Sequence, residues 1–473
     1  MKMQKGGHVM KNVAGDIQQN IQLKELNLQK RNFVNDAVRI IEDFFVRNRG
    51  KFVYIHTGMF ILFSILILVP ALLPVPMEDS TLWNSFTLLA RLLIWGLWFP
   101  LLLLSVIFFG RLWCGLLCPH GALSEYASRK GLNRPIPKWI RWGGVPIASF
   151  VLVTTLGQLL GIREYPLAAL EVLGGTMIIA VLVGFLYADG RRPFCRYLCP
   201  LGPLLGIFSR LGAVSFEKEG RDSKGYPCPT FINTAKKAES SNCIECFKCV
   251  NPGAPGSLHL EIRRPGLEIE EIKKRRPNLW EVVFLFSATG LALGAFHWMV
   301  NPFYIRYKQA VGSFLLNIGL GDWIGWSGPW WMMVNYPEGG DVFNLVDFIS
   351  ITSFMLASMV GTAMILFFLT ALSALLLKDK DPLIVTITRL GYLYAPVALV
   401  SLVIGLGLIL FQSLGAFGFS RETIRMIQGI FFAGGGIWSL YLSIRLQGGL
   451  NRAIIPNILG IGFVALAWYQ ALF

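Results

Sequence analysis

Charged side chains are scarce in this chain, and acidic ones are the scarcest. Only 15% of the 473 residues are charged, with 28 acidic residues against 43 basic ones, while 54% are hydrophobic. Soluble domains are usually about 45 to 50% apolar. With a mean hydropathy of +0.55 as well, the composition excludes an ordinary soluble protein and indicates an integral membrane protein.

The first 50 residues lack a secretory signal. They contain no short apolar core followed by a small-residue cleavage site, and a signal peptide requires both. We therefore expect the N-terminus to stay on the inner side of the membrane. The stretch Val34 to Val46 has apolar residues at helical spacing with charges between them, which predicts a helix lying along the inner surface.

Long apolar runs recur along the whole chain. Since a spanning helix needs about 20 mostly apolar residues, we expect about nine of them. They are predicted at residues 52–73, 87–110, 143–161, 170–188, 279–300, 348–377, 387–412, 424–444 and 453–472. From an inner start, the cytoplasmic connections are 111–142, 189–278, 378–386 and 445–452. The first two are rich in Lys and Arg, as the positive-inside rule requires. Topology and anionic lipid thus explain the net charge of +15, and we expect no nucleic-acid binding.

Cysteine is absent before residue 114 and after residue 249. All eight cysteines fall in the two large connections that we expect to be cytoplasmic: Cys114, Cys118, Cys195, Cys199, Cys228, Cys243, Cys246 and Cys249. The cytosol keeps thiols reduced, so stable disulfides are not expected there. Metal ligation becomes the leading explanation of these residues.

Two of the cysteine pairs belong to an internal repeat. The segments that start at Gly110 and Gly190 share the pattern Cys-x3-Cys-Pro-x-Gly-x-Leu, with cysteines 81 residues apart. Each copy follows a pair of predicted spanning helices, and proline suits the first position of the helix that should follow each second cysteine. Free backbone N–H groups at such a helix start, and nearby arginines, can stabilise a negatively charged iron–sulfur cluster. The arginines are Arg111, Arg191, Arg192 and Arg196.

The third group of cysteines contains Cys-x2-Cys-x2-Cys at Cys243, Cys246 and Cys249. This spacing is typical of bacterial ferredoxins, whose fourth cysteine and proline would fall at positions 253 and 254. This chain has Gly253 and Ala254 there, and the upstream Cys228-Pro229 is the obvious replacement. The total is then eight ligands, the number that two 4Fe–4S clusters need.

The sequence leaves open how the ligands divide. In two-cluster ferredoxins the cysteine before proline ligates the other cluster, and this analogy slightly favours a mixed division of each repeated pair. The alternative keeps the four repeat cysteines on one cluster and the later four on the other. Structural zinc also binds four cysteines, but the Cys-x3-Cys-Pro pattern favours clusters.

Histidine is rare, with five residues. His56 and His297 are expected at opposite depths in the membrane, which argues against a bis-histidine haem within one chain. His120 lies next to Cys118-Pro119 and could contact a cluster ligand. The tryptophans of segment 301–347 predict an aromatic belt at the outer interface, with a quinone or partner site as the alternative. No residue constellation indicates hydrolytic or acyl-transfer catalysis, so we assign no catalytic residue.

The paired Cys-x3-Cys-Pro motifs resemble those of the membrane polyferredoxins related to NapH and NosR, over about residues 52–260. The resemblance implies that the clusters relay electrons between the quinol pool, or a cytoplasmic donor, and a partner redox protein. It implies a bacterial or archaeal cytoplasmic membrane, and an electron-transfer subunit of an oxidoreductase such as a quinol dehydrogenase. The runner-up is a cofactor-maturation reductase of the CcoG kind. The last five helices resemble nothing that we recognise.

The sequence therefore predicts an all-α polytopic membrane protein with a small ferredoxin-like iron–sulfur region. We expect four segments: an amphipathic N-terminal segment at 1–51, the duplicated module at 52–212, the cluster-binding segment at 213–278 and a five-helix module at 279–473. The expected cofactors are two 4Fe–4S clusters, with quinone as a candidate substrate. The expected partners are membrane lipid and a redox protein or the subunits of a larger complex.

Overall fold

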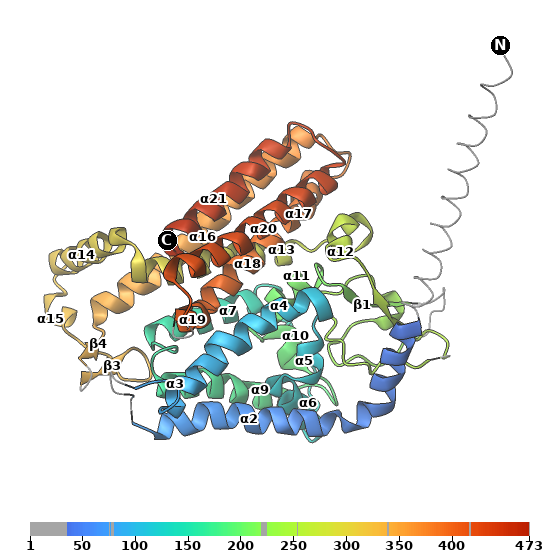
Figure 1. The fold of residues 1–473 in the computed structure, drawn as a ribbon, viewed down its shortest axis with the longest axis horizontal. Helices are drawn as coiled ribbons and strands as arrows, with labels where there is room; N and C mark the ends of the chain where they lie inside the picture. The colour runs from blue at the N-terminus through green and yellow to red at the C-terminus, as the bar shows by residue number, and fades with distance from the viewer. Residues whose placement is uncertain are drawn as a thin grey trace, which may run out of the picture.

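The computed structural model is helical almost throughout (Figure 1). The structure describes residues 36–74, 76, 80–218, 225–252, 254–337, 340–415 and 418–472. In these residues, seven helices are long and apolar enough to cross a membrane: Asp36–Leu72, Phe86–Phe109, Pro166–Leu186, Leu279–Val300, Leu345–Leu377, Leu383–Leu406 and Arg421–Gln447. Two shorter apolar helices, Val145–Leu159 and Ile454–Gln470, occupy the other two predicted positions. The protein is thus an all-α polytopic membrane protein.

The N-terminal half contains the two repeats. Its helices are α2 (Phe52–Leu72), α3 (Phe86–Arg91), α4 (Phe99–Phe109), α5 (Leu112–Leu116), α6 (Pro119–Arg129), α7 (Val145–Leu159), α8 (Pro166–Ala169), α9 (Gly175–Leu186), α10 (Pro193–Tyr197) and α11 (Gly202–Ser209). The second span of each repeat contains a π-helical stretch, η2 (Leu92–Trp98) and η3 (Leu170–Gly174). Such stretches are rare in α-helices, so their presence in both copies supports a common origin of the two repeats.

The C-terminal half packs directly on the repeats. Its helices are α13 (Leu279–Val300), α14 (Pro302–Asn317), α15 (Gly321–Ile324), α16 (Leu345–Leu377), α17 (Leu383–Gly391), α18 (Ala395–Leu406), α19 (Leu408–Leu414), α20 (Arg421–Gln447) and α21 (Ile454–Leu472). Helix α13 touches α7 and α11 of the first half and α16 of the second. One apolar core therefore includes residues of both halves, and the four expected segments stay a prediction.

Helix starts follow ordinary capping rules. Asn344 caps α16 and forms a capping box with Asp347, while Asn301 precedes Pro302 at the start of α14. Side chains of this kind satisfy backbone N–H groups that have no partner inside the helix. The predicted span 387–412 corresponds to Leu383–Leu406 in the structure. This helix contains the 3-10 turn η7 (Tyr392–Tyr394) and ends at Leu406.

A two-stranded sheet closes the cluster-binding segment. Strand β1 (Val214–Lys218) pairs antiparallel with β2 (Leu258–Ile262), with Phe216 opposite Leu260. The described residues between them, 225–252 and 254–257, are irregular apart from the 3-10 turn η4 (Thr234–Lys236), and α12 (Leu267–Glu270) and η5 (Ile272–Lys274) follow. The sheet thereby ties together the two ends of the segment that carries Cys228 to Cys249.

The described part of the N-terminal segment packs on this region. Phe45 stacks on Phe247 with ring centroids 4.5 Å apart, and the Leu260 backbone donates to Glu42 at 2.6 Å. Figure 1 shows residues 36–51 bent relative to α2, alongside β1. The helix that we expected along the membrane surface thus covers the cluster-binding segment, because its aromatic face finds an apolar partner there. Residues 1–35 lie outside the described part of the chain.

Segment 301–347 projects from one end of the molecule (Figure 1). It holds α14, α15 and a short hairpin of β3 (Asn335–Tyr336) and β4 (Asp341–Val342). The four tryptophans of the expected aromatic belt are exposed: Trp323, Trp326, Trp330 and Trp331. This arrangement fits the aromatic-belt interpretation.

Candidate iron–sulfur sites

The two repeats build the same local structure around their cysteines. In the first copy, the Cys118 N–H bonds the Trp113 carbonyl at 2.9 Å, and Pro119 opens α6. In the second copy, the Cys199 N–H bonds the Phe194 carbonyl at 2.8 Å. Proline fits a helix start because it has no N–H to satisfy. The two copies thus share this backbone bond, but α11 begins at Gly202 and not at Pro200, so the predicted proline-started helix is found after Cys118 and not after Cys199.

The four repeat cysteines gather in one place. We call Cys114, Cys118, Cys195 and Cys199 the repeat set. A Cβ atom added at Gly121, three residues after Cys118, would lie 3.2 Å from the Cys195 sulfur, so the start of α6 meets the other copy of the motif. Burial raises the pKa of Cys199 to about 12, and the thiols of Cys118 and Cys114 raise it further. Each thiol of this set therefore has the others as neighbours.

The later cysteines form a second group, the loop set: Cys228, Cys243, Cys246 and Cys249. Burial raises the pKa of Cys249 far above its usual range, and the other three thiols add to this effect. The loop reaches its shape through backbone of positive φ at Glu245 (52°) and Phe247 (58°). Such conformations are costly for residues other than glycine and are typical of functional sites.

This grouping bears on how the ligands divide. The thiols that contribute most to the pKa shift of a cysteine belong to its own set in each case. The arrangement favours the division that keeps the four repeat cysteines together. It disfavours the mixed division suggested by the ferredoxin analogy.

The two sets lie close to each other. A Cβ added at Gly115, next to Cys114, would meet the Ile244 carbonyl at 2.2 Å and the Cys246 nitrogen at 3.1 Å. The repeat backbone and the loop backbone therefore pack in direct contact. Only glycine fits at this position, because any side chain would clash with fixed backbone atoms.

The donor set fits iron–sulfur clusters. All eight cysteines are free thiols, three of them buried in the core and the others half-buried. Among the described residues, no group of three or more His, Cys, Asp or Glu side chains surrounds a single point closely enough to hold one metal ion. In a 4Fe–4S cluster each thiolate instead binds its own iron. Thiols with raised pKa values give up their protons when metal binds.

Arg111 and Arg192 are the buried cations of the site, with 4% and 1% of their surfaces exposed. Arg192 bonds Glu125 through Nε at 2.8 Å and the Cys114 carbonyl through Nη1 at 2.8 Å. Arg111 donates to the Ser241 carbonyl at 2.6 Å and lies 4.0 Å from the Cys114 sulfur. Although burial acts to lower it, the pKa of Arg111 is raised by Cys114 and its neighbours.

The other two candidate arginines lie over aromatic rings. The guanidinium of Arg191 is 5.0 Å from the ring of Phe231, and that of Arg196 is 5.9 Å from the ring of Tyr197. Cation–π contacts of this kind are worth about 0.5 to 1 kcal/mol at exposed sites. Their described contacts are therefore with rings, whereas Arg111 and Arg192 contact the cysteine motifs themselves.

Two buried polar groups in the site have no hydrogen-bond partner in the described residues: the Arg111 Nε and both carboxylate oxygens of Glu245. Burial raises the pKa of Glu245 to about 8. An unpaired buried donor is costly, and the one on Arg111 lies next to the repeat set. We expect this N–H group to donate a hydrogen bond to a sulfur atom of a cluster or of a cysteine.

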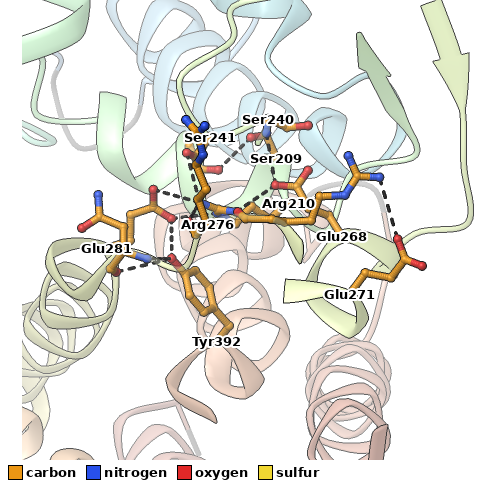
Figure 2. Close-up of polar contacts among 12 residues, drawn as sticks. Ser209, Arg210, Ser240, Ser241, Glu268, Glu271, Arg276, Glu281 and Tyr392 are labelled. Carbon is orange, nitrogen blue, oxygen red and sulfur yellow. Dashed lines mark hydrogen bonds and ion pairs between the residues drawn. The ribbon is translucent and has the colours of Figure 1, made fainter. Parts of the chain in front are cut away.

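A buried ion network anchors the loop set to the C-terminal half (Figure 2). Arg210 follows α11 and bonds Glu268 at 2.9 Å and Glu281 at 2.8 Å. Glu281 starts α13 and accepts from Tyr392 at 2.7 Å, while Glu268 accepts from the Ser240 backbone at 3.1 Å. Although burial acts to lower it, the pKa of Arg210 is raised by Glu281 and Glu268. The segment just before Cys243 is thus held by charges from both halves.

The histidines have structural partners. The Nε2 of His297 lies 2.9 Å from the Ala467 carbonyl, and that of His120 lies 3.1 Å from Thr176 Oγ1. His56 approaches the cysteine region, since its Nε2 is 3.1 Å from the Gly115 carbonyl. No hydrogen bond between the His120 ring and a cysteine is found among the described residues, although the His120 backbone N–H lies close to Cys118.

Sequence patterns gave no sign of a groove between α2 and α6. It has a volume of about 430 Å³, and its lining includes the polar Glu125 and His56, the apolar Phe52 and Phe60, and Cys246. Phe52, His56 and Phe60 follow each other at helical spacing on α2, but their proximity to α6 depends on the tertiary fold.

The chain was compared with known proteins. Two segments, residues 92–141 and 171–219, match a family of 4Fe–4S binding domains, and each contains one Cys-x3-Cys-Pro pair. An uncharacterized protein of Methanocaldococcus jannaschii is 32% identical over 30% of this chain and 67% of its own length. The putative electron transport protein YccM of Escherichia coli is 26% identical over 30% of this chain and 48% of its own.

The regulatory protein NosR of Stutzerimonas stutzeri is 23% identical over 36% of this chain and 27% of its own length. The chain spans 63% of a second archaeal relative and less than half of the bacterial ones. No solved structure is significantly similar. The helical fold and the matched domains define a multi-pass membrane protein that binds iron–sulfur clusters. The chain belongs to the NapH/NosR type of these membrane 4Fe–4S proteins.

Proposed function

We propose that this chain is a membrane electron-transfer protein with two 4Fe–4S clusters, one held by the repeat set and one by the loop set. The observation that carries the proposal is the gathering of eight free thiols into two groups of four. Each group supplies the four thiolates that one cluster needs. The putative electron-transport role in the name of a bacterial relative supports the same function.

The clusters supply the one-electron chemistry, and the chain supplies everything around it. Buried surfaces exclude water from the thiolates, and Arg111 and Arg192 place positive charge beside them. The direct packing of Gly115 on the loop keeps the two sets adjacent. The Lys- and Arg-rich connections that hold all eight cysteines support a cytoplasmic position for both clusters.

The groove between α2 and α6 is the candidate site for a quinol donor. A quinone ring with an isoprenoid tail needs polar partners at one end and an apolar path to lipid at the other. The lining of the groove offers His56 and the Glu125 carboxylate as polar partners and Phe52 and Phe60 as apolar ones. Oxidation of one quinol releases two electrons, one for each cluster, and two protons. A redox partner protein would then take the electrons.

Stopped-flow reduction tests this function. The anaerobic, oxidised protein in lipid nanodiscs is mixed with a short-chain quinol, and the visible absorbance is followed. We expect bleaching in the wild type and about tenfold slower bleaching in His56→Gln, the effect of losing one hydrogen bond of about 1.4 kcal/mol. His297→Gln is the matched control, because this second intramembrane histidine lies away from the groove, and it should react at the wild-type rate.

Two outcomes would count against the proposal. If dithionite reduces the protein but no quinol does, the quinol donor is wrong, although electron transfer from a cytoplasmic donor would stand. If neither reagent changes the absorbance of iron-loaded protein, the electron-transfer function is wrong. Co-purification with a metal-cofactor assembly machinery would favour the maturation alternative.

A further inference from the structure

Arg111 and Arg192 occupy equivalent positions in the two repeats, each three residues before the first cysteine of its pair. Each crosses over to the other repeat. A Cβ added at Gly206 on α11 would lie 3.6 Å from Arg111 Nη1, and one added at Gly121 on α6 would lie 3.0 Å from Arg192 Nη1. The repeats therefore exchange their arginines across the repeat set.

The exchange is not symmetric in charge. Arg192 meets Glu125, which also binds Arg129 at 2.6 Å and pairs with Lys248. The residue equivalent to Glu125 in the second repeat is Gly206, which has no side chain. Arg111 therefore faces a backbone carbonyl and a cysteine sulfur where Arg192 faces a carboxylate. Among the described residues Arg111 forms no ion pair, and the buried Glu245 carboxylate interacts with it only at longer range.

An unpaired buried cation acts strongly on its surroundings. Water and counterions screen it little, and a low local dielectric increases its Coulomb interaction with nearby charge. Reduction of an iron–sulfur cluster adds one negative charge, and net charge and hydrogen bonds to sulfur are known determinants of the reduction potential. A neighbouring cation without a carboxylate partner favours the reduced form more than a cation in an ion pair.

We propose that Arg111 gives the repeat-set cluster a higher reduction potential than the loop-set cluster. This inference rests on the proposed function, in which each cysteine set holds one cluster. Arg111 is a positioning and tuning residue, since it acts through its charge and its bond to the Ser241 carbonyl. The repeat-set cluster would accordingly be the site where an electron preferentially rests.

The cations that act on the loop-set thiols are paired or partly exposed, whereas Arg111 is buried and forms no ion pair. Arg192 acts on Cys246 but is paired with Glu125. Lys237 donates to the Phe216 carbonyl and is half exposed, and Lys248 is paired with Glu125 and is 36% exposed. Exposed charges are screened by solvent. Helix starts also favour the repeat set, because α6 begins directly after Cys118 with its positive dipole end there. The loop-set cysteines lie in irregular chain.

EPR-monitored redox titration of Arg111→Gln tests the inference. The two signals are first assigned with Cys199→Ser and Cys249→Ser, which perturb one set each. In Arg111→Gln we expect the repeat-set midpoint to shift to a more negative potential while the loop-set midpoint shifts less. Arg111→Lys keeps the charge and should stay near the wild type. An unchanged repeat-set midpoint in iron-loaded Arg111→Gln, or a larger shift of the loop set, would overturn the proposal.

If the Arg111→Gln variant does not bind iron, the Glu125→Gln variant provides a second test of the inference. This change releases the charge of Arg192 from its partner, so we expect the repeat-set midpoint to shift to a more positive potential. No shift would mean that buried charge does not set the potentials, and the inference would fall. Iron content distinguishes failure of the proposed function from failure of this inference. Wild-type protein without clusters would refute the proposed function. Variants with the full iron content and unchanged midpoint potentials would refute only the role of Arg111.

Discussion

The repeat set and the loop set each bring four cysteines together, but the backbone structures around them differ. The repeat set places its thiols in or just before short helices, with Cys114 in α5, Cys195 in α10, Cys118 directly before α6 and Cys199 shortly before α11. The loop set lies in irregular chain closed by β1 and β2, with positive φ at two non-glycine residues. The repeat set is thus supported by local helix geometry, while the loop set depends on packing from distant parts of the chain.

The largest expected effect tests whether each set belongs to one cluster. In the double variant Cys114→Ala/Cys118→Ala, iron should fall from about eight to about four atoms per chain, because only the repeat-set cluster loses ligands. Under the mixed division both clusters would lose a ligand, and iron would fall towards zero. The matched variant Cys246→Ala/Cys249→Ala should also retain about half of the iron.

The dependence of the loop set on distant packing is tested at Arg210. Replacing it by Met leaves the buried Glu281 without its cation and Glu268 with Arg263 alone, which should cost about 3 to 5 kcal/mol. Thermal unfolding in detergent measures this loss, and the loop-set EPR signal should disappear on warming before the repeat-set signal. Arg445→Met is the control, since Arg445 is 55% exposed and its partner Glu270 keeps a second ion pair with Arg264, so the loss should be much smaller. Equal losses in the two variants would contradict the anchoring role.

The contact between the first repeat and the loop set is tested by substituting Gly110. A Cβ at Gly110, where φ is +57°, would lie 2.1 Å from Glu245 Oε1. We expect Gly110→Ala to cost about 2 to 5 kcal/mol from backbone strain and overpacking together. Gly190 in the other repeat has a similar φ of +59° but nothing within 4 Å, so Gly190→Ala should cost only about 1 to 2 kcal/mol. Chemical denaturation would measure both, and equal costs would exclude a role of the Glu245 contact.

The smallest expected effect concerns pH. Although burial opposes it, Arg192 and Lys248 lower the pKa of Glu125 to about 2. The stability that Glu125 contributes is therefore present above its unfolded pKa of about 4.5 and is lost as pH falls towards 2. The difference in melting temperature between wild type and Glu125→Gln should be constant from pH 7 to about 5 and narrow below. Glu164→Gln, at an exposed pair with Arg91, should show no such trend.

Much of this arrangement could be predicted from the sequence. Apolar runs predicted a helix at each of the nine positions, and Cys-x3-Cys-Pro predicted the proline-started helix after Cys118, because these features depend on nearby residues. The division of the eight cysteines stays a prediction, since the ferredoxin analogy and the grouping of the thiols in the fold favour different divisions. Convergence of side chains from two repeats is a property of the tertiary fold.

The buried charges were harder to predict. Arg210 looks in the sequence like one more cytoplasmic cation, yet its partners come from α12, α13 and η7. The difference between Glu125 and Gly206 is visible once the repeats are aligned, but its meaning requires the crossing of Arg111 and Arg192. The interactions of these charged side chains depend on their burial and their ion-pair partners rather than on their residue type.

The central claim is that the two cysteine sets hold iron. Anaerobic purification followed by iron and acid-labile sulfide assay, with EPR of the reduced protein, tests it most directly. We expect about eight iron and eight sulfide per chain and two interacting 4Fe–4S signals. A colourless protein without iron, or stoichiometric zinc in its place, would contradict the account.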